Sequence, residues 1–177
     1  MSKVITFSRV FPKYHPKAGK ETFFVEQLIN SLGIILPFVK DDLLPYVNDF
    51  MVLAGEMQKH HTIRAGKRFK AGDYFSPRIW SGKPYNSKQI KICDDVLIKK
   101  TWDIEINNRG GAAWFEVLIN GEIYGQIHHG NDEDVNVLGL CNLAQNDGLS
   151  LRNFQAWFSE LPFQGQIICW SDQVDYN

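Results

Sequence analysis

The sequence predicts an α+β protein, a small, mixed and partly antiparallel β-barrel with flanking helices. Helical periodicity of apolar residues occurs only near the two ends of the chain. At least five short stretches between them alternate polar and apolar residues, and the Asn120-Gly121 pair predicts a β-hairpin. The 177 residues suit a single domain with a substantial core. We find no repeat or linker, so we expect one domain over residues 1–177 with an acidic insertion near 107–146.

The N-terminal part should contain a first strand over residues 4–7, a basic loop with two prolines, and two helices. Thr22 is suited to cap a helix that ends at Gly33, because apolar residues recur at a spacing of four between them. A second helix is expected over residues 41–54, capped by Asp41 or Asp42 and with Pro45 in its first turn.

Alternating residues predict the strands that follow. Pro77 should break or kink the first of them. Residues 130–148 are polar and acidic, and we expect a loop there. Ser150 should then cap a last helix, which Pro162 ends. The expected strands are residues 74–80, 88–92, 96–106, 113–119, 122–127 and 166–170.

Charge is distributed unevenly along the chain. Residues 59–100 carry 11 basic and 3 acidic side chains, whereas residues 101–177 carry 2 basic and 11 acidic ones. A localised basic segment attracts phosphate even when the net charge is close to zero. The alternative is that the acidic region folds against the basic segment and neutralises it.

The basic segment begins with a polar stretch that ends at Gly66. In an extended chain Thr62 and Arg64 point to the same side, and a turn at Lys59 would bring its amine to Thr62. A desolvated lysine beside a hydroxyl forms a base and nucleophile pair. An arginine beside them offers a planar fork of donors for a phosphate, a carboxylate or a base edge. The alternative is a loop of solvated surface charges.

The order helix, Lys59-x-x-Thr62-x-Arg64, short basic loop, Gly72-Asp73 and strand resembles the ASCH family of the PUA-like superfamily. The resemblance is most specific from Lys59 to Ile92. It implies a pseudo-barrel with a cleft beside its helices that binds RNA or a single nucleobase or nucleotide, modified or unmodified. Some small members are amidohydrolases that remove the acyl group from N4-acetylcytidine, which would make Lys59 the base and Thr62 the nucleophile.

The same resemblance implies a glutamate on a following strand as the third catalytic residue. The corresponding position holds Lys91. The nearest acidic residues are Asp94, Asp95, Asp103 and Glu105, and Glu105 is the candidate because it lies on the polar side of its strand, as Asp103 does.

Basic and aromatic side chains near the motif are the predicted lining of the ligand cleft. Bases stack on aromatic rings, and Trp80 and Tyr85 flank an expected exposed turn. We expect Phe75 and Trp102 to lie in the core instead. The predicted ligand-binding residues are Arg64, His61, Lys67, Arg68, Arg78, Trp80 and Tyr85.

The remaining composition narrows the classes of protein. No stretch approaches the ~18 to 20 apolar residues of a membrane span. Three cysteines without a CxxC spacing argue against disulfides and a zinc cluster, so we expect a cytoplasmic protein. We expect no metal and no cofactor.

Three functions stay open. The first is binding of RNA or a nucleoside or nucleotide, and the second is the amidohydrolase. The third is a protein-interaction domain whose acidic region, from residue 101 onward, contacts a basic partner.

Overall fold

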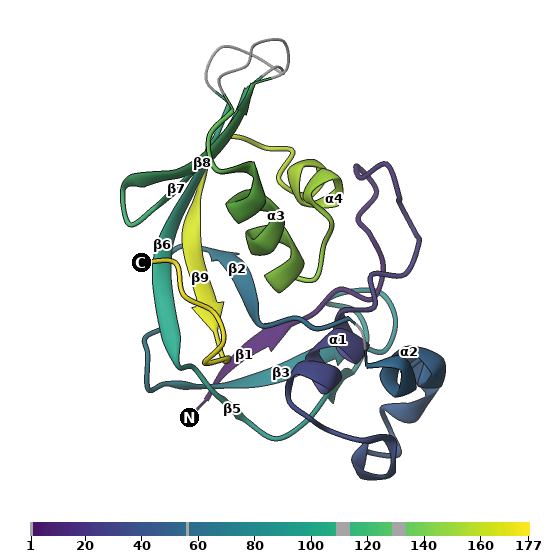
Figure 1. Cartoon of the computed structure of the whole chain (residues 1–177). Helices are drawn as coiled ribbons and strands as arrows, with labels where there is room; N and C mark the ends of the chain where they lie inside the picture. Colours follow the sequence, from purple (N-terminus) through teal and green to yellow (C-terminus); the bar gives the residue numbers. More distant parts are fainter. Residues whose placement is uncertain (1, 56, 109–113, 129–133) are drawn as a thin grey trace.

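The computed structural model describes residues 2–55, 57–108, 114–128 and 134–177. It is an α+β structure with two sheets, shown in Figure 1. The strands are β1 (Lys3–Thr6), β2 (His61–Ala65), β3 (Tyr74–Trp80), β4 (Gln89–Lys91), β5 (Val96–Leu97), β6 (Lys100–Asn107), β7 (Trp114–Ile119), β8 (Glu122–His128) and β9 (Phe163–Cys169). The helices are α1 (Phe24–Ser31), α2 (Asp49–Ala54), α3 (Val137–Asn146) and α4 (Leu151–Trp157), with single 3₁₀ turns η1 (Leu36–Phe38) and η2 (Leu44–Tyr46).

The larger sheet is antiparallel throughout, in the order β2-β9-β6-β7-β8. The alternation predicted for β6 is confirmed, since Trp102, Ile104 and Ile106 are all buried. The hairpin between β7 and β8 is also confirmed. Asn120 and Gly121 both have the positive φ angles, 52° and 86°, that a tight hairpin turn requires.

The smaller sheet places β3 between β1 and β4, with β5 on β3. β1 and β3 are parallel, whereas β3 and β4 are antiparallel. Of the two outcomes expected at Pro77, a break or a kink, the break is wrong, because β3 runs through Pro77 and its carbonyl accepts a bond from Ile92 N. The α+β class is therefore confirmed, but the two sheets do not close into a barrel over the described ranges.

The helices differ from expectation in the middle of the chain. The predicted helix over residues 41–54 is wrong in its first half: η2 ends at Tyr46, Val47 is extended, and α2 begins only after Asn48. Asn48 accepts a bond from Met51 N and so caps α2. Ser150 caps α4 as predicted, through a bond from Asn153 N.

The expected loop over residues 130–148 is also wrong for the part that the structure describes. Residues 137–146 form α3, whose Leu140, Leu143 and Ala144 are fully buried. Residues 129–133 lie outside the described ranges. Among the described residues of the segment 107–146, β7 and β8 extend the large sheet and α3 packs against β8.

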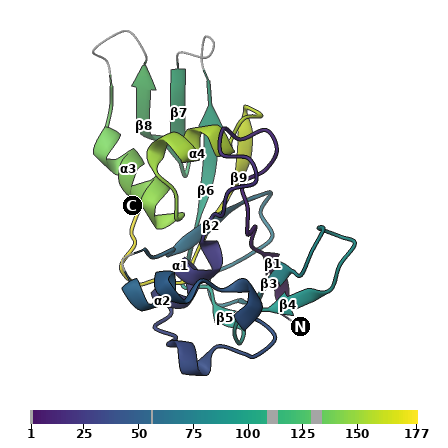
Figure 2. The ribbon, with the colours of Figure 1, turned by 90° about the vertical axis from the view of Figure 1, so that its right-hand side faces the viewer.

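The arrangement of layers positions the site. α3 and α4 cover one face of the large sheet, while α1 and α2 lie beside the small sheet (Figures 1 and 2). The loop between β1 and α1 runs next to α4. No helix in the described ranges has the length and apolar character needed to cross a membrane.

Candidate functional site

The centre of the candidate site is a buried ion pair. Lys59, which precedes β2, is only 1% exposed, and Asp147, at the end of α3, is 5% exposed. Lys59 Nζ lies 2.6 Å from Asp147 Oδ1 and also donates to the Asp147 backbone carbonyl. The ammonium group lies 4.3 Å from the centre of the Phe24 ring, on whose face a cation is favoured. Few lysines are buried so completely, and those that are need such partners.

Backbone hydrogen bonds bring these distant residues together. Lys59 N donates to Gln27 O of α1 at 3.1 Å, and His60 N donates to Asn146 O of α3 at 2.8 Å. The segment that enters β2 is therefore held between two helices. Asp147 is the C-cap residue of α3, so the helix presents its carboxylate to this segment.

Burial dominates the electrostatics of the pair. Desolvation lowers the pKa of Lys59 to about 8, although the Asp147 carboxylate opposes this shift. Desolvation likewise raises the pKa of Asp147, against the opposing effect of Lys59. With a pKa of about 8, the lysine amine becomes neutral under mildly alkaline conditions.

A small cavity of about 30 Å³ adjoins the pair, with room for roughly one water molecule. Thr62 and Arg64 line it together, as expected for alternate residues of a strand. Arg64 Nη2 donates to the Thr6 carbonyl at 2.7 Å, which ties β2 to the end of β1. The cavity is lined by Phe7, Ser8, Phe24, Lys59, Thr62, Ile63, Arg64, Asp147 and Trp157.

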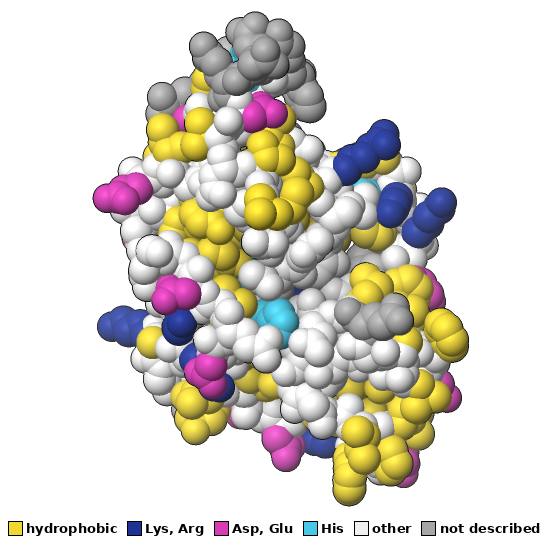
Figure 3. Space-filling model, viewed as in Figure 1, with side chains coloured by type: hydrophobic (Ala, Val, Ile, Leu, Met, Phe, Trp, Pro, Cys, Tyr) yellow, Lys and Arg dark blue, Asp and Glu magenta, His cyan; other side chains and the backbone are white. Residues whose placement is uncertain are grey.

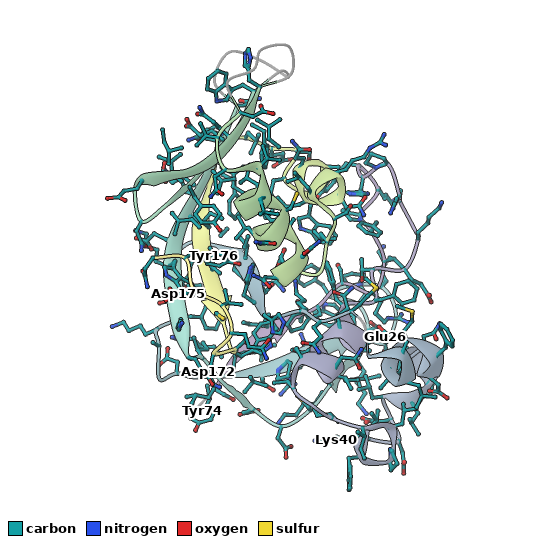
Figure 4. All side chains as sticks on the ribbon, in the orientation of Figure 1. Glu26, Lys40, Tyr74, Asp172, Asp175 and Tyr176 are labelled. Carbon is teal, nitrogen blue, oxygen red and sulfur yellow. The ribbon has the colours of Figure 1, made fainter. Side chains whose placement is uncertain are left out.

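His61 supports the pair from within the core and is fully buried. Its Nε2 lies 2.8 Å from the Tyr176 hydroxyl, which also accepts a bond from Asn146 Nδ2 at 2.9 Å. Figure 4 shows Tyr176 beside α3 and β9. Desolvation, reinforced by the charge of Lys59, holds the pKa of His61 well below its usual value, so the imidazole is neutral.

A much larger cleft, of about 1180 Å³, opens on the other side of this segment. His60 is the residue of the predicted motif that lines it, between α1, the end of α3 and the start of α4. Figure 3 looks onto this face and shows Lys and Arg side chains gathered at its upper right, over the loop after β1. The cleft is lined by Phe11, Lys17, Gly19, Lys20, Glu21, Thr22, Phe23, Gln27, Met57, Gln58, His60, Gln145, Asn146, Gly148, Leu149, Ser150 and Asn153.

The lining of this cleft is polar but not highly charged. It includes five side-chain amides, two phenyl rings and two exposed lysines, Lys17 and Lys20, against one glutamate, Glu21. The buried Nδ1 of His60 and Oε1 of Gln27 have no hydrogen-bond partner among the described residues. Buried polar atoms usually find such a partner, so this wall of the cleft retains unused hydrogen-bonding capacity.

The prediction of Glu105 as the third member of the site is corrected by this geometry. Glu105 lies on β6 opposite Gln164 and Leu118, and the carboxylate that contacts Lys59 belongs to Asp147. Asp147 was not predicted, because the third catalytic residue was expected on a strand that follows the Lys59-x-x-Thr62-x-Arg64 motif. The usable signal was the apolar spacing in residues 137–144, which predicts a helix ending beside this acid.

Of the predicted ligand-binding residues, Arg64 lines the small cavity. The remaining six line neither cavity: His61, Lys67, Arg68, Arg78, Trp80 and Tyr85. Arg78 Nε donates to Ser76 Oγ at 3.3 Å, and Lys67 Nζ lies 2.5 Å from the carboxylate of Asp103. Arg68 contributes its carbonyl to Lys3. The rings of Trp80 and Tyr85 pack together with centroids 5.4 Å apart, and Tyr85 is 88% exposed.

Acidic residues of the C-terminal region lie beside four of the 11 basic side chains of residues 59–100, in line with the alternative to a basic cleft. Asp103 and Asp147 pair with Lys67 and Lys59. Lys99 pairs with Asp172, and Lys100 lies 3.8 Å from Asp175. Figure 4 shows Asp172 and Asp175 along the C-terminal segment beside the large sheet.

The last property of the site concerns metal binding. Within the described ranges no three His, Cys, Asp or Glu side chains are grouped to hold a metal ion. The fold and the site define an α+β protein with a buried lysine–aspartate pair between a small cavity and a large polar cleft. No family model, curated protein or solved structure matches the chain.

Proposed function

We propose that this chain binds a nucleoside or nucleotide unit, free or within RNA, in the large cleft. The observation that carries the proposal is a cleft of about 1180 Å³ that combines side-chain amides, phenyl rings and exposed lysines. Typical ligand sites have volumes of ~300 to 1,000 Å³ and combine apolar walls with a few convergent polar groups. A nucleotide fits such a space.

Each part of a nucleotide has a matching group in the lining. Asn and Gln side chains hydrogen-bond to base edges, and unstacked bases pack on aromatic rings. Gln58, Gln145 and Asn153 supply amides, the half-buried Phe23 supplies a ring, and the two lysines supply charge for phosphate. The small cavity does not suit this role because its volume is near that of one water molecule.

A relation to the ASCH family is part of the proposal, with two sheets that do not close over the described ranges in the place of its PUA-like barrel. Its support is the order of elements, since α1 and α2 precede β2, and Gly72-Asp73 precede β3. The cleft beside the helices agrees with what that resemblance implies. A cytoplasmic protein that binds RNA or nucleotides is the function that this combination favours.

Replacing both cleft lysines should weaken binding of a ten-nucleotide single-stranded RNA. We expect Lys17→Ala with Lys20→Ala to lower affinity roughly tenfold and to reduce the salt slope by about one per lysine, because each contact releases a counterion. Fluorescence anisotropy at several salt concentrations measures both quantities.

The matched control is Lys83→Ala with Lys88→Ala, which removes two exposed lysines that line neither cavity. The control should bind as the wild type does. Equal losses of RNA affinity in both double variants would contradict binding in the cleft, because they would show that the RNA responds only to the overall positive charge. Absence of binding to RNA and to cytidine monophosphate alike would remove the proposal.

Hydrolysis of an acylated nucleoside is the second candidate, favoured by one specific observation. The amine of Lys59, with its pKa lowered to about 8, lines the same small cavity as the Thr62 hydroxyl. In this proposal the small cavity, which has room for about one water molecule, opens to admit the acyl group. The neutral amine then takes the hydroxyl proton while Thr62 Oγ1 attacks the acyl carbon. The amine of the nucleoside leaves with a proton, and water then releases the acyl group from Thr62.

Cytidine release from N4-acetylcytidine tests this second candidate. Because the base must be unprotonated, the rate should rise with pH and level off above about 8. Thr62→Ser should retain activity and Thr62→Val should abolish it. Turnover that survives Thr62→Val, or no turnover at any pH, would exclude the mechanism.

A further inference from the structure

An exposed apolar surface covers α2 and the segment that precedes it. Phe38, Phe50 and Leu53 are each exposed by 75 to 76%, and Ile35 is 57% exposed. We call this surface, together with the less exposed Leu44 and Met57, the α2 patch. Figure 3 shows the hydrophobic side chains gathered at its lower right. Clustered apolar side chains on a surface mark interaction sites more often than single ones do.

The patch belongs to a well-anchored part of the fold. Glu26 of α1 accepts a bond from Asn48 N at 2.8 Å, and Asn30 Nδ2 donates to the Met51 carbonyl at 3.1 Å. Figure 4 shows Glu26 at the junction of α1 and α2. Val52 is buried, so α2 already has its inner face packed, and Phe50 and Leu53 form the opposite face.

The rim of the patch is acidic. Residues 34–55 contain a single lysine, Lys40, and three aspartates. Lys40 is already paired with Asp94, at 3.1 Å. Asp41, Asp42 and Asp49 are exposed and have no salt-bridge partner among the described residues. Acidic side chains border the hydrophobic ones in Figure 3.

The combination of an apolar centre and an acidic rim selects the kind of occupant. A nucleic acid or an anionic lipid surface would be repelled by the aspartates. A second copy of this chain, docked patch to patch, would place the aspartates of the two copies against each other. A segment that presents apolar side chains beside lysines or arginines satisfies both parts of the surface.

We propose that the α2 patch docks a basic amphipathic segment of a partner protein. Met57 lies in the patch and also lines the large cleft, so the docked segment borders the mouth of the cleft. This inference does not depend on nucleotide binding, because none of the cleft lysines takes part in it.

A fluorescein-labelled 18-residue helical peptide of leucine and lysine is the probe, and the same peptide with glutamate for lysine is its counterpart. We expect the lysine peptide to bind the full chain by fluorescence anisotropy, with affinity that falls as salt increases. Phe50→Ser with Leu53→Ser should weaken binding at least tenfold. Asp41→Asn, Asp42→Asn and Asp49→Asn together should weaken it several-fold and flatten the salt dependence.

Controls separate the patch from general stickiness. Leu138→Ser removes an apolar side chain of α3 that is 74% exposed, and Asp172→Asn removes an acid from the C-terminal segment. Both variants should bind as the wild type does. Equal binding of the glutamate peptide, or equal losses in the control variants, would overturn the proposal. A concentration-dependent dimer that Phe50→Ser with Leu53→Ser abolishes would overturn it in favour of a second copy.

Discussion

Replacing Asp147 with alanine is expected to destabilise the folded chain by about 3 to 5 kcal/mol at pH 7. The change leaves the Lys59 ammonium buried without its carboxylate, whereas the native pair is separated by only 2.6 Å. The loss should shrink at pH 9, because the pKa of Lys59 is already lowered to about 8 and a neutral amine needs no counter-charge. Urea denaturation at both pH values measures the difference.

Two control variants separate this effect from the loss of any carboxylate. Asp172→Ala removes the acid of an exposed pair with Lys99, so it should change stability by less than about 1 kcal/mol. Lys59→Met with Asp147→Leu replaces both charges by apolar groups and should recover most of the loss. An Asp147→Ala variant as stable as Asp172→Ala would show that the pair is not buried as described.

Replacing Gly148 with alanine should destabilise the fold by about 2 to 4 kcal/mol, for two reasons that add. Gly148 has a φ of +81°, in the left-handed region that favours glycine. An added Cβ would also lie 2.2 Å from Gln27 Oε1 and 3.3 Å from Phe24 Cδ1. The side chain of Gln27, buried between α1 and the cleft, would have to move.

Gly33→Ala is the matched comparison because it isolates the backbone effect. Gly33 has a similar φ of +66°, but a Cβ there meets nothing within 4 Å. We expect it to lose about 1 to 2 kcal/mol, the strain of the left-handed conformation alone. Unfolding midpoints in urea compare the two variants, and equal losses would contradict the close packing between Gly148 and Gln27.

The fold was predictable where a pattern is local. The Asn120-Gly121 turn, the alternation along β6 and the serine cap of α4 each depend on residues within a few positions of one another. α2 was placed too early because the pattern of apolar residues continues through η2, and only the extended Val47 and the Asn48 cap separate them. The closure of a barrel depends on how distant strands pair, which periodicity does not specify.

The candidate site was predictable only in part, for the same reason. The spacing predicted that Thr62 and Arg64 point to the same side with Lys59 nearby, and all three residues line the small cavity. Asp147 is 88 residues from Lys59 in the sequence, and only the packing of α3 against the entry to β2 joins them. Sequence reasoning therefore found the cation and the hydroxyl but assigned the carboxylate to the wrong element.

Nuclear magnetic resonance most directly tests the central claim, that the large cleft binds a nucleotide. Cytidine monophosphate is titrated into the isotope-labelled chain, and the backbone amide shifts are followed. Shifts of His60, Gln145 and Gly148, which line the cleft, are predicted to move together and saturate, while those of Gly82 and Gly121 stay fixed. Shifts that move only outside the cleft, or none at millimolar ligand, would contradict the account.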